Sequence, residues 1–192
     1  MKKRIAVYGG SFNPIHIGHL ALANYLCEWG EVDEVWFLIS PQNPLKIIRD
    51  LLPEELRLDL VRAAIADYPR FKASDFEFHL PKPSFTYRTL EALKKEYPDF
   101  EFILLMGADN WLIINQWRNY KAIIAENRIL IYPRLGYSIS ESALPSTVRL
   151  INAPVFEFSS SAIRQALREG KDLRFFLPPS VYERLKGMQL DK

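Results

Sequence analysis

Short apolar runs along the chain alternate with longer stretches in which apolar residues recur every three or four positions. The runs at 5–8, 35–39, 100–106 and 128–132 are rich in β-branched and aromatic residues and predict strands buried on both faces. Two weaker patterns predict strands at 71–80, where Phe76 and Phe78 alternate with other residues, and at 155–158.

Helices are predicted between these strands. One follows the first strand at 20–26, and a second begins after Pro53, a position where a missing N–H costs nothing. Its apolar face consists of Leu56, Leu60, Ala63 and Ala64, and a third helix carries Leu90 and Leu93. A fourth helix ends at Gly170, and Pro178-Pro179 opens a short final one.

Strands that alternate with helices are typical of an α/β protein. We therefore predict a Rossmann-like, doubly wound, mostly parallel sheet in one domain that spans residues 1–192. We find no internal repeat and no low-complexity segment. Ligands of open parallel sheets bind outside the carboxyl ends of the strands, so the functional residues are expected at that edge.

The turn after the first strand carries the strongest chemical pattern. Gly9 and Gly10 let the backbone turn sharply and approach a ligand closely, and the helix that follows offers free N–H groups to a phosphate. His16 and His19 are three residues apart, so on a helical turn they share one face, which Gly18 leaves unobstructed. The pattern indicates a polyphosphate site with two neighbouring imidazole donors.

Simpler interpretations exist for each part of this pattern. Two glycines after a strand form an ordinary turn, and single histidines are often structural. The His pair could also bind a metal ion, but a zinc site needs a third ligand, and the only other histidine is His79, to which we assign no role. The ordered coincidence of strand, glycines, histidines and helix favours the phosphate site, and we predict no metal ligands from the protein.

Residues 9–19, Gly-Gly-Ser-Phe-Asn-Pro-Ile-His-Ile-Gly-His, resemble the signature of the nucleotidyltransferase superfamily that contains the bacterial nicotinate-mononucleotide adenylyltransferases. The string from His16 to His19 also resembles a motif of class I aminoacyl-tRNA synthetases. A synthetase is disfavoured, because the chain has no Lys-Met-Ser-Lys-Ser string and no room for an anticodon-binding domain.

A second candidate phosphate element lies near the end of the chain. Ser159, Ser160 and Ser161 precede a helix, and Arg164 follows one turn later. A serine N-cap would explain one of these hydroxyls. Hydroxyls, helix N-terminus and guanidinium together make a better anion site. The segment resembles the Ile-Ser-Ser-x-x-Ile-Arg motif of the same family, with Phe158 in place of the isoleucine.

Further segments follow the predicted strands. Considered by itself, Lys46 is interpreted as a solvated loop lysine. It lies, however, in a segment that resembles the family's Asn-Pro-x-Lys segment, and the resemblance implies that this lysine approaches the phosphates. Ser84 or Thr86 could cap the third helix. The resemblance implies instead that the Ser84 segment binds the nicotinate nucleotide, with Phe85 replacing the usual tyrosine.

The segments 107–111 and 116–120 place aromatic and polar residues after the fourth strand. Asp109 could be a helix N-cap and the tryptophans could be core. Aromatic rings among polar groups also suit a flat pyridine ring, and the resemblance implies that Trp117 stacks on nicotinate. Arg134 belongs to a loop similar to the family's Arg-x-Gly-Tyr loop. Residues 138–147 are predicted to form an exposed loop.

Composition narrows the function classes only slightly. Of 192 residues 48% are hydrophobic and 25% charged, and the net charge of +2 calls for neither nucleic-acid nor membrane partners. The single cysteine, Cys27, is expected to pack as a small hydrophobe, which indicates a reducing compartment. The residues before Gly9 are too few for a signal-peptide core, and no stretch is long enough to span a bilayer, so we expect a cytoplasmic protein.

Two phosphate elements and an aromatic pocket predict adenylyl transfer from ATP to nicotinate mononucleotide. The attacking phosphate is already largely ionised, so no general base is needed, and Asn13, where the family often has Asp, is compatible with this mechanism. Catalysis is assigned to His16, His19, Lys46 and Arg164. Mg²⁺ is expected to bind mainly through the ATP phosphates and water.

The predicted ligand contacts form two sets. ATP is assigned to Gly9, Gly10, Ser11, Phe12, His16, His19, Gly107, Asp109, Ser159, Ser160, Ser161 and Arg164. Nicotinate mononucleotide is assigned to Asn13, Lys46, Thr86, Asp109, Asn110, Trp111, Trp117 and Arg134. The alternatives are a nicotinamide mononucleotide or phosphopantetheine adenylyltransferase and a non-catalytic nucleotide sensor. The sequence leaves a homo-oligomer, loop closure and regulation open.

Overall fold

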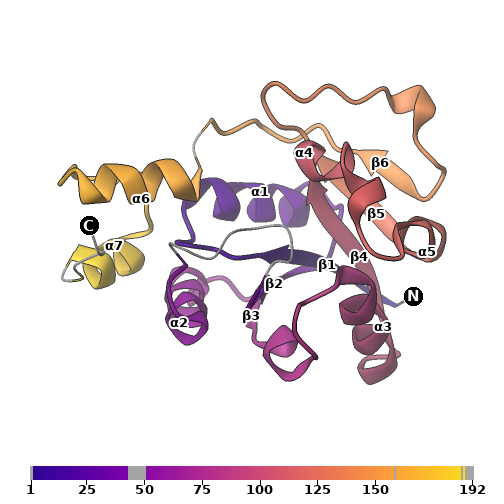
Figure 1. Cartoon of the computed structure of the whole chain (residues 1–192), viewed down its shortest axis with the longest axis horizontal. Helices are drawn as coiled ribbons and strands as arrows, with labels where there is room; N and C mark the ends of the chain where they lie inside the picture. The colour runs from indigo at the N-terminus through magenta and orange to yellow at the C-terminus, as the bar shows by residue number, and fades with distance from the viewer. Residues whose placement is uncertain (1, 43–50, 158, 187, 189–192) are drawn as a thin grey trace.

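The computed structural model describes residues 2–42, 51–157, 159–186 and 188. In this part of the chain, six parallel strands form one sheet in the order β3-β2-β1-β4-β5-β6 (Figure 1). The strands are β1 (Lys3–Gly10), β2 (Glu34–Ile39), β3 (Phe71–Ser74), β4 (Phe100–Gly107), β5 (Arg128–Tyr132) and β6 (Val148–Leu150). The predicted α/β, doubly wound, parallel sheet is confirmed.

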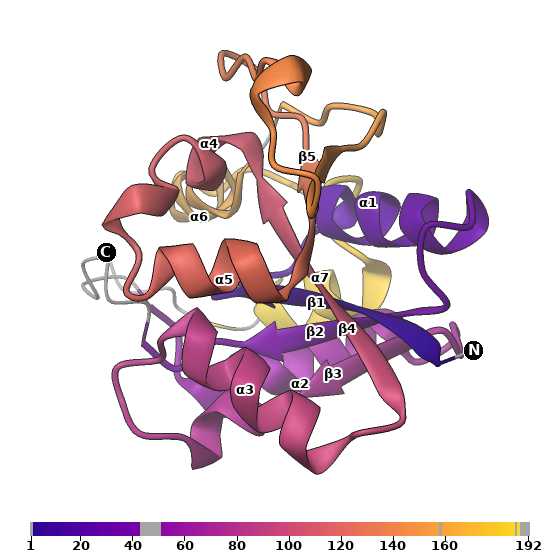
Figure 2. The same cartoon turned by 90° about the vertical axis from the view of Figure 1, so that its right-hand side faces the viewer.

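Helices cover both faces of the sheet (Figures 1 and 2). One face packs against α1 (Ile17–Glu28), α2 (Glu54–Ile65), α6 (Ser160–Arg168) and α7 (Pro179–Lys186). The other packs against α3 (Thr86–Glu96), α4 (Ala108–Trp111) and α5 (Tyr120–Glu126). Each strand therefore buries both of its sides, which explains why the apolar runs are nearly continuous.

The register of the central strands separates two cores. Tyr8 and Phe37 are paired neighbours and belong to the core on the α1 side, whereas Val7 and Trp36 belong to the core on the α3 side. Cys27, at the end of α1, is buried in the first core, and burial raises the pKa of its thiol to about 11. The prediction that Cys27 packs as a small hydrophobe is confirmed.

The strand predicted at 71–80 ends early. β3 stops at Ser74, and Phe76–His79 forms a 3₁₀ helix. The Ser74 hydroxyl accepts a hydrogen bond from the amide of Phe76 at 3.2 Å, so a local turn replaces the strand ladder. His79 lies on this 3₁₀ helix with 76% of its side chain exposed, as expected for a residue without a role.

The strand predicted at 155–158 is also wrong over 155–157, and residue 158 lies outside the described part of the chain. The sixth strand is instead Val148–Leu150, whose Val148 is the register partner of Ile129 on β5. Pro154 has no N–H for a ladder, and Val155 and Phe156 are 45% and 36% exposed, so this stretch lacks the burial that the prediction assumed.

The connections that leave two neighbouring strands pass to opposite faces of the sheet, and ligands of this architecture bind at such a point. β1 has β2 on one side and β4 on the other, so the connections that leave β1 and β4 run to opposite faces. Gly170, with a φ of 73°, lies just beyond the C-cap of α6, as predicted for a terminating glycine. Residues 138–147 are mostly exposed, also as predicted, and contain a 3₁₀ turn at Glu141–Ala143.

Candidate active site

The loop after β1 is tightly folded. A Cβ added to Gly10 would lie 3.0 Å from the ring of Phe12, whereas a Cβ at Gly9 would meet nothing within 4 Å. Phe12 is buried and has a φ of 42°, a backbone conformation that residues other than glycine rarely adopt. The loop keeps the close approach predicted for a phosphate site, with open space in front of Gly9.

The two imidazoles stack at the start of α1. The ring centroids of His16 and His19 are 3.7 Å apart, with an angle of 28° between the planes. His16 is the N-cap, and its amide donates to Nδ1 of His19 at 3.3 Å. Since Nδ1 of His19 accepts this bond, the proton of the neutral ring lies on Nε2, which becomes a donor. The predicted shared face is confirmed.

Burial keeps His16 uncharged. Its exposed fraction is 5%, and desolvation, followed by the positive charge of Arg134, lowers its pKa to about 4. A neutral imidazole still donates one N–H to a phosphate oxygen. Arg134 thus acts electrostatically on His16, and its assignment to the nicotinate nucleotide stays a prediction.

The serine-arginine helix docks directly on the loop after β1. Arg164 donates through Nη1 to the carbonyl of Asn13 at 2.8 Å, and the hydroxyl of Ser160 donates to the carbonyl of Pro14 at 3.0 Å. The Ser159 side chain caps α6 by accepting from the amide of Ala162 at 3.3 Å. The two predicted phosphate elements, about 150 residues apart in the chain, are therefore in contact.

The residues after β4 turn tightly around Gly107. Gly107, rather than Asp109, is the N-cap of α4, so the predicted N-cap alternative for Asp109 is wrong. A Cβ on Gly107 would lie 2.3 Å from Oδ1 of Asp109, which shows how closely the carboxylate folds back. The same oxygen accepts from Nε of Arg134 at 3.4 Å. Asp109 and Arg134, predicted separately, form one ion pair at the carboxyl edge.

Two tryptophans that were assigned to nicotinate mononucleotide belong to the α3 side of the sheet. Trp111 and Trp117 are partly buried and pack against the core on the α3 side. The indole Nε1 of Trp117 is enclosed and has no acceptor among the described residues. The guanidinium of Arg118 lies 5.2 Å from the ring centre of Phe85, so the segments 116–120 and 84–86 approach each other.

The N-cap of α3 is not the residue that the sequence suggested. Phe85 is the N-cap and provides no side-chain hydrogen bond, so neither Ser84 nor Thr86 is the cap, and Thr86 is the first helical residue. Ser84 is buried instead, beside the carboxylate of Glu77. The helix-capping alternative for this segment is therefore wrong, and its ligand role stays a prediction.

Two buried charged residues beneath the site were missed in the sequence. Arg57 on α2 is fully buried, and Glu77 on the 3₁₀ helix is 6% exposed, with a pKa raised by desolvation. The hydroxyl of Thr89 donates to Glu77 at 2.9 Å. A signal for Arg57 was available, since it lies at helical spacing between Pro53 and Leu60, on the apolar face of α2.

The predictions for Lys46, for metal ligands and for the membrane concern different parts of the chain. Lys46 lies outside the described residues. Within the described ranges, no group of three His, Cys, Asp or Glu side chains could hold a metal ion. None of the described helices is both long and apolar enough to cross a membrane.

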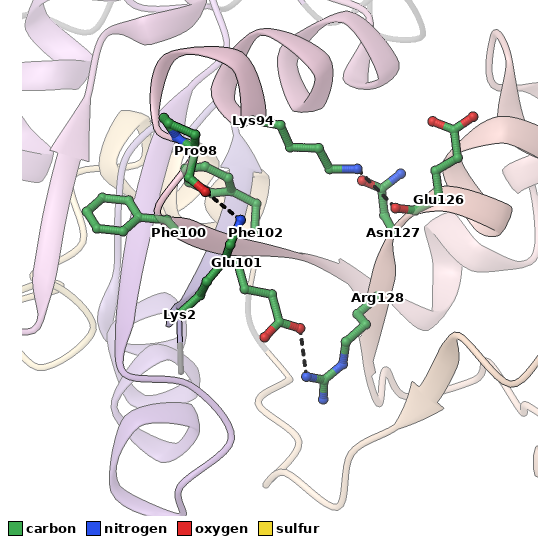
Figure 3. Close-up of a pocket in the computed structure, with 9 residues that line it drawn as sticks. All are labelled: Lys2, Lys94, Pro98, Phe100, Glu101, Phe102, Glu126, Asn127 and Arg128. Atoms are coloured by element: carbon green, nitrogen blue, oxygen red, sulfur yellow. Dashed lines mark hydrogen bonds and ion pairs between the residues drawn. The ribbon is translucent and has the colours of Figure 1, made fainter.

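A hollow of about 310 Å³ lies at the amino ends of β1, β4 and β5, opposite the site (Figure 3). It is lined by Lys2, Lys94, Pro98, Phe100, Glu101, Phe102, Glu126, Asn127 and Arg128. The dashed contacts in Figure 3 show that its cations already pair with a carbonyl or a carboxylate of the protein. None of the predicted site residues lines it, so the candidate active site is the carboxyl edge.

Comparisons with known proteins identify the family. The model of the cytidylyltransferase-like family matches residues 7–166. A probable nicotinate-nucleotide adenylyltransferase of Bacteroides thetaiotaomicron is 57% identical over 185 residues, which cover 96% of this chain and 92% of the relative. Its counterpart in Bacteroides fragilis is 56% identical over 184 residues, with the same two coverages.

A solved structure agrees over nearly the whole chain. The Plasmodium falciparum nicotinic acid mononucleotide adenylyltransferase complexed with NaAD aligns with a TM-score of 0.82 at 25% identity, over 98% of each chain. A putative nicotinate-nucleotide adenylyltransferase of Vibrio parahaemolyticus gives a TM-score of 0.72 at 27% identity, over 96% of this chain and 99% of that one. The chain therefore belongs to the cytidylyltransferase-like family and, within it, to the nicotinate-nucleotide adenylyltransferases.

Proposed function

We propose that this protein transfers the adenylyl group of ATP to nicotinate mononucleotide, which yields nicotinate adenine dinucleotide and pyrophosphate. The observation that supports this most is the contact between the loop after β1 and the serine-arginine helix, through Arg164 and the carbonyl of Asn13. This contact brings two N-termini of helices, two imidazoles and a guanidinium to one edge of the sheet. The relatives provide the identity of the second nucleotide.

The reaction is an in-line displacement at phosphorus. An oxygen of the 5′-phosphate of nicotinate mononucleotide attacks the α-phosphorus of ATP, and the bond from that phosphorus to the oxygen bridging to the β-phosphorus breaks. The second pKa of a phosphate monoester is about 6, so the nucleophile is already a dianion near neutral pH and transfers no proton. The protein's task is to hold both phosphates in line and to stabilise the charge of the transition state.

We assign the stabilisation of that charge to three described residues. His19 donates through Nε2, since its Nδ1 is occupied by the amide of His16. His16 donates as a neutral ring, and Arg164, which is bonded to the carbonyl of Asn13, contributes a fixed positive charge. Lys46 would add a second cation at the leaving pyrophosphate. Mg²⁺, carried by the ATP phosphates, supplies further charge neutralisation.

The second nucleotide is assigned to Thr86, Asn110, Trp111 and Trp117, together with the ion pair of Asp109 and Arg134. Trp117 provides a flat apolar surface for a pyridine ring. Both phosphopantetheine and nicotinamide mononucleotide remain alternatives as acceptors. We favour nicotinate because the relatives at 56% and 57% identity carry that name. The reaction is placed in the cytoplasm, where ATP is made and consumed.

One assay tests the proposal. The purified chain is incubated with ATP and Mg²⁺ and, in parallel, with nicotinate mononucleotide, nicotinamide mononucleotide or phosphopantetheine, and pyrophosphate release and the dinucleotide product are measured. We expect the highest kcat/KM with nicotinate mononucleotide. Preference for another acceptor would replace the substrate assignment, and ATP binding without any turnover would favour a nucleotide sensor.

A further inference from the structure

The side chain of Arg57 is held beneath the loop after β1 without a carboxylate partner. Nη1 donates to the carbonyl of Ser11 at 2.7 Å and to that of Ser40 at 2.9 Å, and Nε donates to the carbonyl of Leu52 at 2.9 Å. Glu54 acts on it electrostatically, but no ion pair joins Arg57 to a carboxylate in the described ranges, and its exposed fraction is 0%. Burying a charge in this way is costly, so the hydrogen bonds to these carbonyls must offset the lost hydration.

The bond to Ser11 bears directly on the phosphate loop. In a trans peptide unit, the carbonyl of one residue and the N–H of the next point in opposite directions. When Arg57 holds the Ser11 carbonyl towards α2, the amide of Phe12 is directed away from α2. Phe12 is the residue with the φ of 42°, so the conformation on which this orientation depends is itself strained.

Further hydrogen bonds join the loop after β1 to the segments that contain Ser40 and Leu52. The amide of Ser40 donates to the carbonyl of Gly10 at 2.9 Å, and the amide of Leu52 donates to the side-chain carbonyl of Asn13 at 3.2 Å. Ser40 and Leu52 are the two residues besides Ser11 whose carbonyls Arg57 binds. The guanidinium therefore lies where the loop, the end of β2 and the entry into α2 meet.

A second guanidinium holds the loop from its other side, since Arg164 binds the carbonyl of Asn13 at 2.8 Å. The loop from Ser11 to Asn13 thus lies between Arg57 on α2 and Arg164 on α6. Arg164 is partly exposed and was assigned to the phosphates, whereas Arg57 is enclosed by protein and cannot touch a ligand. The two arginines have different tasks, and that of Arg57 is indirect.

We propose that Arg57 is a positioning residue for ATP: by binding the carbonyls of Ser11, Ser40 and Leu52, it fixes the strained loop in the conformation that presents its amides to the triphosphate. Its unpaired charge also favours the anion from behind the loop. This inference rests on the proposed function for the identity of the nucleotide. It adds a residue that contacts neither substrate.

The test uses two replacements of Arg57 and one matched control. Arg57→Met keeps much of the volume but removes the charge and all three hydrogen bonds, and Arg57→Lys keeps the charge but lacks the planar fork. The control is Arg62→Met on the same helix, where the guanidinium is exposed and lies 3.5 Å from Asp59. Circular dichroism and thermal melting establish that each variant is folded. Calorimetric titration with ATP and steady-state kinetics then compare them with the wild type.

We expect Arg57→Met to raise the Kd for ATP by about tenfold or more, as the loss of one charge-assisted hydrogen bond already implies. kcat should fall as well, because the α-phosphorus is no longer held in line. Arg57→Lys should bind ATP several-fold more tightly than Arg57→Met, and Arg62→Met should match the wild type. The KM for nicotinate mononucleotide should change least.

The outcomes separate this inference from the proposed function. A folded Arg57→Met variant with wild-type Kd for ATP and wild-type kcat would overturn the positioning role, since only stability would then depend on Arg57. Should Arg57→Met fail to fold, Arg57→Lys decides: unchanged ATP affinity overturns the inference, and weakened affinity supports it. Calorimetry needs no turnover, so a wild type that binds ATP but makes no dinucleotide would contradict the proposed reaction alone.

Discussion

At the carboxyl edge of the sheet, Arg57 and Glu77 are buried and bonded to neutral carbonyls and hydroxyls, whereas at the amino edge Arg128 and Glu101 pair with each other at 2.9 Å. Half of the Arg128 side chain is exposed, so water screens that pair. A buried charge lowers stability unless its hydrogen bonds are satisfied, so its partners are held in a fixed geometry. An exposed ion pair contributes little to the free energy of folding. The buried charges therefore hold the backbone of the carboxyl edge in place, whereas the exposed pair leaves the amino edge little affected.

The largest expected effect concerns the stacked imidazoles of the carboxyl edge. We predict that His16→Ala or His19→Ala lowers kcat by about a hundredfold to a thousandfold, because each removes a donor to the charged transition state. Pyrophosphate release under saturating substrates measures the effect. His79→Ala is the matched control, since that ring is exposed on the 3₁₀ helix, and its kcat should not change. Near-normal turnover in either imidazole variant would remove it from the mechanism.

The buried state of His16 predicts a dependence of stability on pH. Desolvation, with the charge of Arg134, lowers the pKa of His16 to about 4 in the folded protein, against 6.5 ordinarily. Between these values the unfolded chain binds a proton that the folded chain does not, so the contribution to stability is complete above pH 6.5 and declines as the pH falls towards 4. The expected loss is about 3 kcal/mol.

Urea unfolding at several pH values measures this loss, with His16→Gln as the comparison. The variant has no group that titrates at this position, so its free energy of unfolding should decline less over the same range. Parallel curves for wild type and variant would show that His16 titrates alike in both states and is not held neutral.

A smaller effect is expected on the aromatic side of the site. Trp117→Ala should raise the KM for nicotinate mononucleotide by about tenfold, because a stacked ring contributes on the order of 1 kcal/mol beyond its burial. The KM for ATP should stay within about twofold. Trp29→Ala serves as the control, since Trp29 is 68% exposed at the end of α1. An equal rise in both KM values would point to a general loss of packing.

The smallest effect is expected at the amino edge. Arg128→Ala breaks the exposed pair with Glu101 and should change the free energy of unfolding by less than about 0.5 kcal/mol, with kcat and both KM values unchanged. Chemical denaturation and the standard assay test this. A marked loss of activity would show that the hollow of Figure 3 communicates with the site and would end the contrast between the two edges.

The sequence supported the sheet and the phosphate loop because both are encoded locally. Strands buried on two faces leave continuous apolar runs, and the spacing of His16 and His19 determines their shared face on α1. The parallel sheet and the contact of α6 with the loop after β1 agree with the prediction that both phosphate elements face the carboxyl edge. The roles of individual residues in binding stay predictions.

Other features depend on partners that are distant in the chain. The Ser74 hydroxyl turns the backbone away from the ladder, which the alternation of Phe76 and Phe78 could not reveal. β6 is three residues long and is defined by its pairing with β5. Arg57 is satisfied by carbonyls of residues 11, 40 and 52, so no local pattern discloses what it binds.

The tight packing around Gly107 limits how this enzyme can be altered. A side chain at that position would displace Oδ1 of Asp109, 2.3 Å away, and press on the ring of Tyr132 at 3.1 Å. Asp109 and Tyr132 both adjoin Arg134, so one added methyl group would disturb these three side chains together. Variants designed to use other acceptors should therefore keep glycine at position 107.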